Sequence, residues 1–209
     1  MDDTRGTFDR ASATWDEEPR RVKLAEELAA CIAAEAGISP DMDALDYGCG
    51  TGLVTLRLRP FVRSITGADT SAGMLEILRE KIRNLDVPGV RTVLLDPEAT
   101  EGIQGHFHLV VSCMTLHHVA DVESLLLDLR RVLLPGGTVV IADLEKEDGS
   151  FHGDTIPAVH TGFDRKEMAE LLENAGFGDV RDITAAGIEK VSRDGRKRLY
   201  PVFLMVARA

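Results

Sequence analysis

The sequence predicts an α/β fold: a doubly wound, mostly parallel sheet of seven strands, with helices on both faces and a C-terminal antiparallel hairpin. Three observations carry this prediction. Apolar runs of strand length alternate with helical patterns over nearly the whole chain. The run from Phe107 to Cys113 is apolar almost throughout, as in strands buried on both faces of a parallel sheet. Gly48, Gly50 and Gly52 follow the first strand, at the edge where such sheets bind ligands.

The chain begins with a polar, turn-rich stretch over residues 1–19, in which Phe8 and Trp15 are the only large apolar groups. Two interpretations stay open for it: a disordered tail, or a lid whose two aromatic rings close over a pocket. An amphipathic helix is then expected from Arg20 to Ala36, ended by Gly37.

The first β-α-β unit follows. The pattern predicts a strand over residues 44–47, a helix over 52–59 that ends at Pro60, and a second strand over 64–68. Thr70 or Ser71 is suited to cap the next helix, which finishes near Asn84. A third strand is expected over residues 90–95.

The second half repeats this alternation. We expect strands over residues 107–113 and 138–144 with a helix over 122–134 between them. Asp164 is suited to cap a helix over 165–175, and strands over 179–191 and 200–207 are expected to form the hairpin. These elements form one domain with four parts. An N-terminal lid segment and helix occupy residues 1–37, and a cofactor-binding core occupies 40–145. A substrate-side loop follows at 145–163, and a C-terminal helix and hairpin at 164–209.

Composition and charge narrow the class of protein. Hydrophobic residues make up 44% and charged residues 28%, and the net charge is −11, which disfavours binding to nucleic-acid phosphates. No apolar run approaches the ~20 residues of a membrane span. The start of the chain lacks the features of a signal peptide, so a cytoplasmic location is expected. The three cysteines, Cys31, Cys49 and Cys113, have neither disulfide nor zinc spacing, and reduced thiols are expected.

Carboxylates stand at the ends of the predicted strands. The first strand ends in Asp46, the second in Asp69 and the third in Asp96. Two cofactors fit a glycine loop followed by an acid that reaches ribose hydroxyls: a nicotinamide dinucleotide and S-adenosylmethionine. Asp46, two places before Gly48, is poorly placed for an anionic pyrophosphate and suits the ammonium group of a methionine. The spacing therefore favours S-adenosylmethionine.

Four stretches then resemble, in order and spacing, the motifs of the class I S-adenosylmethionine-dependent methyltransferases, and they lie at residues 45–52, 67–75, 107–118 and 133–138. The subgroup is similar to the small-molecule enzymes that include those of ubiquinone and menaquinone biosynthesis. The resemblance implies the Rossmann-like fold of that family and a cofactor site made of Asp46, Tyr47, Gly48, Cys49, Gly50, Thr51, Gly52, Asp69, Thr70, Met74, Asp96, Pro97, Ser112 and His117.

One departure from the family's patterns narrows the substrate. Enzymes that methylate amino groups of adenine or glutamine carry an Asn/Asp-Pro-Pro-Tyr/Phe stretch after the fourth strand, whereas this chain has Ser-Cys-Met-Thr at residues 112–115. A small-molecule acceptor is expected instead, with its O, N, S or C nucleophile unassigned. The oligomeric state, monomer or homodimer, is also unassigned.

A histidine is the natural proton acceptor if the nucleophile starts protonated. His160 and His152, in the loop after the fifth strand, are the first candidates for this catalytic role, followed by His117. For His117 and His118, packing against the cofactor is the competing interpretation. The acids Asp143, Glu145, Asp148 and Asp154 are interpreted as solvated, and no metal site is expected.

Two other functions stay open. The first is a cofactor-binding module without catalysis. The second is a nicotinamide-dependent oxidoreductase, which the glycine spacing disfavours.

Overall fold

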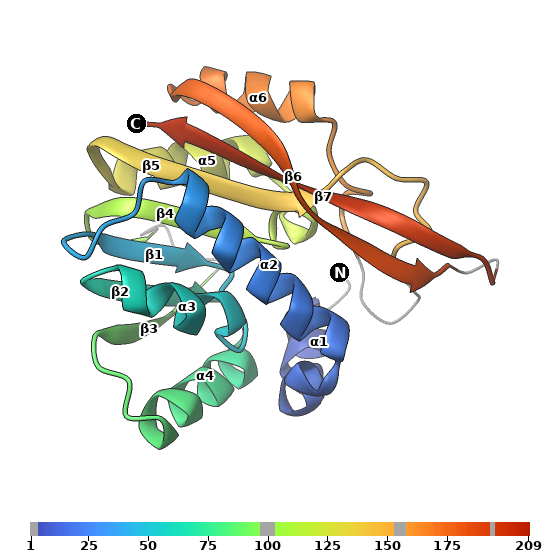
Figure 1. Cartoon of the computed structure of the whole chain (residues 1–209), viewed down its shortest axis with the longest axis horizontal. Helices are drawn as coiled ribbons and strands as arrows, with labels where there is room; N and C mark the ends of the chain where they lie inside the picture. Colours follow the sequence, from blue (N-terminus) through green and yellow to red (C-terminus); the bar gives the residue numbers. More distant parts are fainter. Residues whose placement is uncertain (1–3, 97–102, 153–157, 193–194) are drawn as a thin grey trace.

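The sheet has seven strands in the order β3-β2-β1-β4-β5-β7-β6. A computed structural model describes residues 4–96, 103–152, 158–192 and 195–209. The first five strands are parallel, and β7 lies antiparallel between β5 and β6, so the sheet is mixed, with the expected hairpin at its edge (Figure 1). The strands are β1 (Asp43–Tyr47), β2 (Ser64–Asp69), β3 (Val90–Leu94), β4 (Phe107–Cys113), β5 (Leu133–Leu144), β6 (Gly178–Val191) and β7 (Lys197–Arg208).

The order of the strands places a ligand crevice. The chain runs outward from β1 through β2 to β3 and then returns to β4 on the other side of β1. At such a reversal the connections leave the carboxyl ends of two neighbouring strands in opposite directions, and a crevice opens between them. The glycine loop follows β1 and therefore lies at this point.

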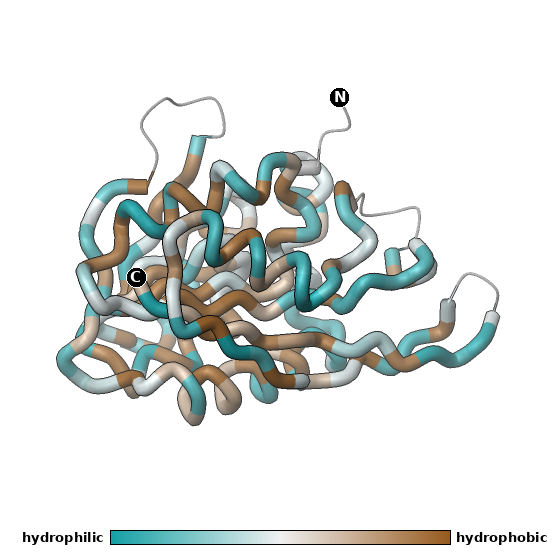
Figure 2. The backbone as a smooth tube through the Cα atoms, turned by 90° about the horizontal axis from the view of Figure 1, so that it is seen from above, coloured by the Kyte–Doolittle hydropathy of each residue, from teal (hydrophilic) through white to brown (hydrophobic). Residues whose placement is uncertain are grey.

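Helices cover both faces of the sheet. Val139 and Ile141 of β5 pack with α5 and α6 on one face, whereas Val140 and Ala142 pack with α2 and α3 on the other. This alternation buries both faces of β5 and concentrates apolar residues in the interior (Figure 2). The helical segments are α1 (Thr4–Ala11), η1 (Ser12–Glu17), α2 (Pro19–Glu35), α3 (Leu53–Leu58), η2 (Arg59–Phe61), α4 (Ala72–Asn84), η3 (Leu116–His118), α5 (Val122–Val132) and α6 (Arg165–Asn174).

The N-terminal segment is helical, so the interpretation as a disordered tail is wrong for residues 4–17. Asp9 accepts hydrogen bonds from the Ser71 hydroxyl at 2.6 Å and from the backbone N–H of Gly73 at 2.9 Å, at the start of α4. Asp16 accepts one from the Thr51 hydroxyl at 2.6 Å and pairs with Lys81. These contacts fix α1 against the start of α4, and η1 against the glycine loop and α4.

Two strands are longer than expected, because residues predicted to end a helix or to lie between elements pair with neighbouring strands. Gly136 donates its backbone N–H to Ala209, and Ala209 donates to Gly137, so β5 begins at Leu133 and includes the Pro-Gly-Gly sequence. Lys197 pairs with Val191 and starts β7. The expected caps are confirmed: Ser71 accepts the N–H of Met74, and Asp164 accepts those of Lys166 and Glu167.

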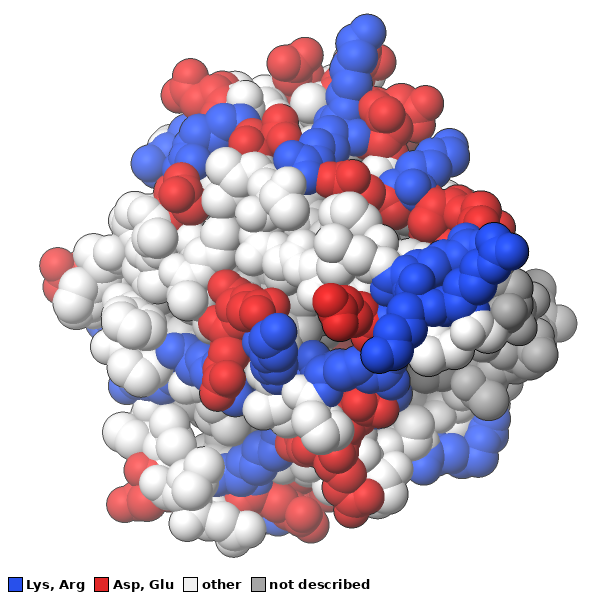
Figure 3. Space-filling model, turned by 45° about the vertical axis from the view of Figure 1, so that its right-hand side comes forward, with Lys and Arg blue, Asp and Glu red and all other residues white. Residues whose placement is uncertain are grey.

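The charged surface is mixed in sign. Acidic and basic side chains lie side by side on the face in Figure 3. Among the ion pairs of the molecule are Arg198 with Asp148 at 2.6 Å and Arg165 with Asp182 at 2.7 Å. On this face, acidic side chains are thus interspersed with basic ones, although the net charge of the chain is negative. In the part of the chain that the structure describes, no helix is both long and apolar enough to cross a membrane.

Candidate active site

A cavity of about 590 Å³ lies at the carboxyl ends of β1 and β4. Its wall is built from the glycine loop, the starts of α2 and α4, the N-terminal segment, η3, the chain after β5, and the end of β6. This volume lies within the ~300–1,000 Å³ typical of ligand sites. Segments far apart in the sequence therefore enclose one site.

The glycine loop leaves exposed backbone on the cavity floor. Gly48 has φ +73° and donates its N–H to the carbonyl of Ala68 at 2.8 Å, and a side chain there would collide with Thr115. Gly50 has φ +54°, and a Cβ atom built on it meets no heavy atom within 4 Å. The space above Gly50 is open to a ligand, as expected of a loop that holds one against bare main chain.

Asp46 is a buried carboxylate at the floor of the cavity, with 1% of its surface exposed. Its Oδ2 accepts a hydrogen bond from the Thr55 hydroxyl at 2.6 Å. Burial raises the pKa of Asp46 to about 7, the Thr55 hydrogen bond opposes the rise, and the charge of Asp69 adds to it. A cationic group in the cavity would stabilise the ionised form. The site therefore fits the ammonium group of a methionine.

Asp69 links the ends of β1 and β2. Its Oδ2 accepts the N–H of Gly50 and its Oδ1 the N–H of Ser71, both at 2.8 Å. Burial raises the pKa of Asp69, and these backbone donors counteract the rise. Because each carboxylate oxygen has two acceptor sites, Asp69 retains capacity for a pair of ligand hydroxyls. Its position on the cavity wall fits the expected contact with a ribose.

Most of the predicted site residues lie on the cavity wall. They are Asp46, Tyr47, Gly48, Cys49, Gly50, Thr51, Asp69, Thr70, Met74, His117 and His152. Four predicted residues are not on it, namely Gly52, Asp96, Ser112 and His160. Pro97 lies outside the described residues.

Each of these four has a different environment. Gly52 faces Leu78 of α4, where an added Cβ atom would approach within 2.3 Å. The Ser112 hydroxyl donates to the carbonyl of Tyr47 at 3.0 Å and ties β4 to β1. His160 Nε2 lies 2.9 Å from the carbonyl oxygen of Val119. The side chain of Asp96 is exposed, and the neighbouring Leu95 lines the cavity instead.

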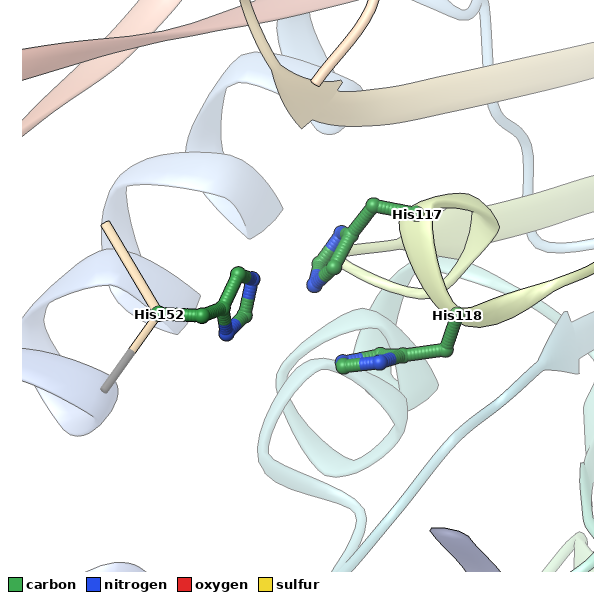
Figure 4. Close-up of side chains that lie close together, drawn as sticks. All are labelled: His117, His118 and His152. Carbon is green, nitrogen blue, oxygen red and sulfur yellow. The ribbon is translucent and has the colours of Figure 1, made fainter. Parts of the chain in front are cut away.

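Three histidines meet on the wall of the cavity. His117 and His118 come from η3 and His152 from the chain after β5, and their rings face one another (Figure 4). The centroid of the His117 ring lies 4.1 Å from that of the His118 ring and 4.9 Å from that of the His152 ring. Burial, with the nearby His117, lowers the pKa of His152 to about 4. His152 is thus held as a neutral ring.

A buried carboxylate orients one of these rings. Asp143 Oδ1 lies 2.6 Å from Nδ1 of His117, and its Oδ2 accepts the backbone N–H of His117 at 3.3 Å. Burial raises the pKa of Asp143, but the charge and hydrogen bonds of His117 and the N–H of Leu144 outweigh this and hold the pKa below its usual value. Asp143 therefore fixes the orientation of the His117 ring, and Nε2 is the ring nitrogen that lies away from the carboxylate.

The remaining wall includes Arg21 and Lys190, which no motif of the sequence connects with the site. Arg21 stacks over Trp15, its guanidinium carbon 3.6 Å from the ring centroid. Lys190 lies 4.8 Å from the centroid of the Phe151 ring. Burial and the charges of Arg20 and Arg21 lower the pKa of Lys190. Their positions on the cavity wall could not be predicted from amphipathic spacing, because only the tertiary fold brings them there.

Known proteins resemble this chain in sequence. A family profile described as a methyltransferase domain matches residues 45–141. An uncharacterized methyltransferase of Schizosaccharomyces pombe is 32% identical over 160 residues, which cover 69% of this chain and 56% of that protein. The ubiquinone/menaquinone biosynthesis C-methyltransferase UbiE of Shewanella sediminis is 34% identical over 115 residues, covering 53% of this chain and 46% of that protein. The chain spans about half the length of these curated relatives.

Solved structures resemble it in fold. Phosphoethanolamine N-methyltransferase 2 of Haemonchus contortus, solved with phosphomonomethylethanolamine and S-adenosylhomocysteine, superposes with a TM-score of 0.76 at 15% identity, covering 100% of this chain and 60% of that one. At this identity the likeness shows the fold alone.

Proposed function

Because the chain belongs to the class I S-adenosylmethionine-dependent methyltransferases, we propose that it transfers a methyl group from S-adenosylmethionine to a small-molecule acceptor. We assign cofactor binding to the core at residues 40–145 and the acceptor side to the loop at 145–163 and the N-terminal segment. The O, N, S or C nucleophile is left open, since the relatives include enzymes named for transfer to carbon and to nitrogen.

A single observation carries this proposal: one cavity joins the open backbone of Gly50 and the buried Asp46 to a histidine-lined end. The first end has the chemistry of the cofactor, an acid for its ammonium group and a second acid, Asp69, for its ribose. The other end has room and proton-accepting groups for an acceptor. Two reactants held in one enclosed space meet the main requirement of methyl transfer, which is alignment.

When bound, S-adenosylmethionine supplies an electrophilic methyl group on a positively charged sulfur. The acceptor atom forms a bond to the methyl carbon while the carbon–sulfur bond breaks, and its electron pair remains on the sulfur of S-adenosylhomocysteine. A proton of the acceptor leaves to solvent or to a neutral histidine. Phe8 and Trp15 line the cavity, and their apolar rings would limit the access of water to the bound reactants.

Calorimetric titration separates the candidate cofactors. We expect S-adenosylhomocysteine to bind one to one and NAD⁺ to give no heat above dilution. Binding of NAD⁺ alone would favour the oxidoreductase, and absence of S-adenosylhomocysteine binding would overturn the proposal.

A labelled-methyl screen over small phenols, thiols, amines and carbon acids then separates an enzyme from a binding module. We expect transfer to at least one acceptor class, with Gly50→Ala as the control that lacks the open backbone. Cofactor binding with no transfer to any class would favour a non-catalytic regulatory module.

A further inference from the structure

We propose that His117, His118 and His152 bind one divalent metal ion of the zinc type at the acceptor end of the cavity. Each ring offers one nitrogen, and these three nitrogens lie within 4.8 Å of one another (Figure 4). Three imidazoles with one position left to water or substrate form a recurring catalytic zinc site.

The buried carboxylate Asp143 has the geometry of an outer partner of a metal ligand. Metal-bound histidines commonly donate their second ring N–H to a carboxylate, which fixes the tautomer and the ring orientation. The 2.6 Å contact between Asp143 and Nδ1 of His117 is of this kind. It leaves Nε2 as the nitrogen of His117 that a metal ion would bind, with loss of any proton that the ring carries there.

His152 supplies an independent observation. Its Nε2 is buried and has no hydrogen-bond partner in the described part of the chain. Buried polar atoms are generally satisfied, so an unpartnered one within a cluster of ligand-capable nitrogens points to a missing partner. A metal ion bound to Nε2 is such a partner.

The chemistry of the donors selects the ion. Imidazole nitrogens favour Zn²⁺, Co²⁺, Ni²⁺ and Cu²⁺ over Mg²⁺ and Ca²⁺, which take oxygen ligands. Tetrahedral Zn–N bonds of ~2.0–2.1 Å place ligand nitrogens ~3.3–3.4 Å apart. Because Asp143 holds His117, closing the cluster to this spacing requires rotation of the His118 and His152 side chains.

The open coordination position faces the cavity, and this part of the inference rests on the proposed function. A metal there binds an acceptor through a hydroxyl or enol oxygen and favours its anion. The acceptor class is accordingly an oxygen acid, methylated on that oxygen or on the carbon conjugated to it.

Cobalt binding to the tag-free 209-residue chain tests the site. We expect one equivalent of Co²⁺ to give visible d–d bands typical of four- or five-coordinate cobalt, and Zn²⁺ to abolish them. His152→Ala and His118→Gln should each weaken Co²⁺ binding at least ~10-fold, and Asp143→Asn ~10–100-fold. His106→Ala is the matched control, because His106 is exposed and lies outside the cavity.

Each result decides the proposal. Octahedral cobalt spectra, or binding unchanged in both His152→Ala and His118→Gln, would overturn it, and the rings would then be proton acceptors or packing groups. Near-ultraviolet circular dichroism identifies a variant that has not folded, and the second histidine variant then decides. Titration with S-adenosylhomocysteine keeps the two proposals apart: metal binding without cofactor binding overturns only the proposed function, and the reverse result overturns only the metal site.

Discussion

The two ends of the cavity differ in how the chain builds them. The cofactor end comes mainly from one loop after β1 and the acid at the end of β2, with Gly50 and Asp69 joined by a hydrogen bond of 2.8 Å. The acceptor end combines the N-terminal segment, η3, the chain after β5 and the end of β6. Local sequence thus specifies the first end, whereas tertiary packing assembles the second.

The largest expected effect is at Asp46. In the folded state its pKa rises from 3.8 to about 7, so the folded protein retains a proton that the unfolded chain releases between these values. The free energy of unfolding therefore falls as pH rises through this window. Asp46→Asn removes this dependence, and its stability relative to wild type should increase by ~2–3 kcal/mol from about pH 5 to about pH 8 in urea unfolding.

The same variant should bind S-adenosylhomocysteine ~10–100-fold more weakly near neutral pH, because a hydrogen bond to a charged group is lost. Greater stability with weaker binding would mark Asp46 as a group kept for the ligand. Unchanged affinity would contradict its assignment to the ammonium group.

Gly50 tests the open backbone of the cofactor end. Gly50→Ala places a methyl group in the space above the loop, and we expect ~10-fold weaker S-adenosylhomocysteine binding by calorimetry. Gly136→Ala is the matched control, because Gly136 also has positive φ, +75°, with no heavy atom within 4 Å of an added Cβ. Equal loss of stability in both variants with equal affinity would contradict a ligand above Gly50.

Asp16 tests whether the two ends are independent. Asp16→Ala removes the hydrogen bond from Thr51 and the pairing with Lys81. We expect faster hydrogen exchange over residues 4–17 and ~5-fold weaker S-adenosylhomocysteine binding, about the effect of one hydrogen bond. Glu17→Ala, at an exposed neighbouring position, is the control. If Asp16→Ala speeds exchange without altering affinity, the segment serves the acceptor end alone.

The smallest effect is expected at Ser112. Ser112→Ala removes the hydrogen bond to the Tyr47 carbonyl and should lower the free energy of unfolding by ~1 kcal/mol, with cofactor affinity within ~2-fold of wild type. Thermal unfolding and calorimetry measure the two quantities. A large loss of affinity would return Ser112 to the binding site, where the sequence had placed it.

The sequence predicted the parts of the molecule that depend on local pattern. Alternating strands and helices, the glycine loop and the caps at Ser71 and Asp164 each follow from residues close together in the chain. Asp69 was also predicted, because a β-α-β unit has a nearly constant length. The seven strands and the mixed α/β architecture are confirmed on this basis.

The arrangement of the acceptor end could not be predicted from local sequence patterns. His152 approaches η3 because the two ends of its loop pair with each other, the N–H of Glu147 donating to Thr161 at 2.8 Å and that of Lys146 to Phe163 at 3.0 Å. No periodicity in the loop predicts this pairing. For the same reason His160 was favoured over His117 in sequence, although His117 and His152 line the cavity.

The N-terminal segment sets a limit on what the molecule can accommodate. Trp15 and Phe8 form part of the wall, and the Phe8 ring lies 5.1 Å from that of His118, while Asp16 holds the same segment to the glycine loop. The volume of about 590 Å³ is therefore that of the cavity with this segment in place, and under the proposed function cofactor and acceptor would share it. An acceptor with a long tail has to displace this segment, so acceptor size is coupled to the stability of residues 4–17, which lie outside the sheet.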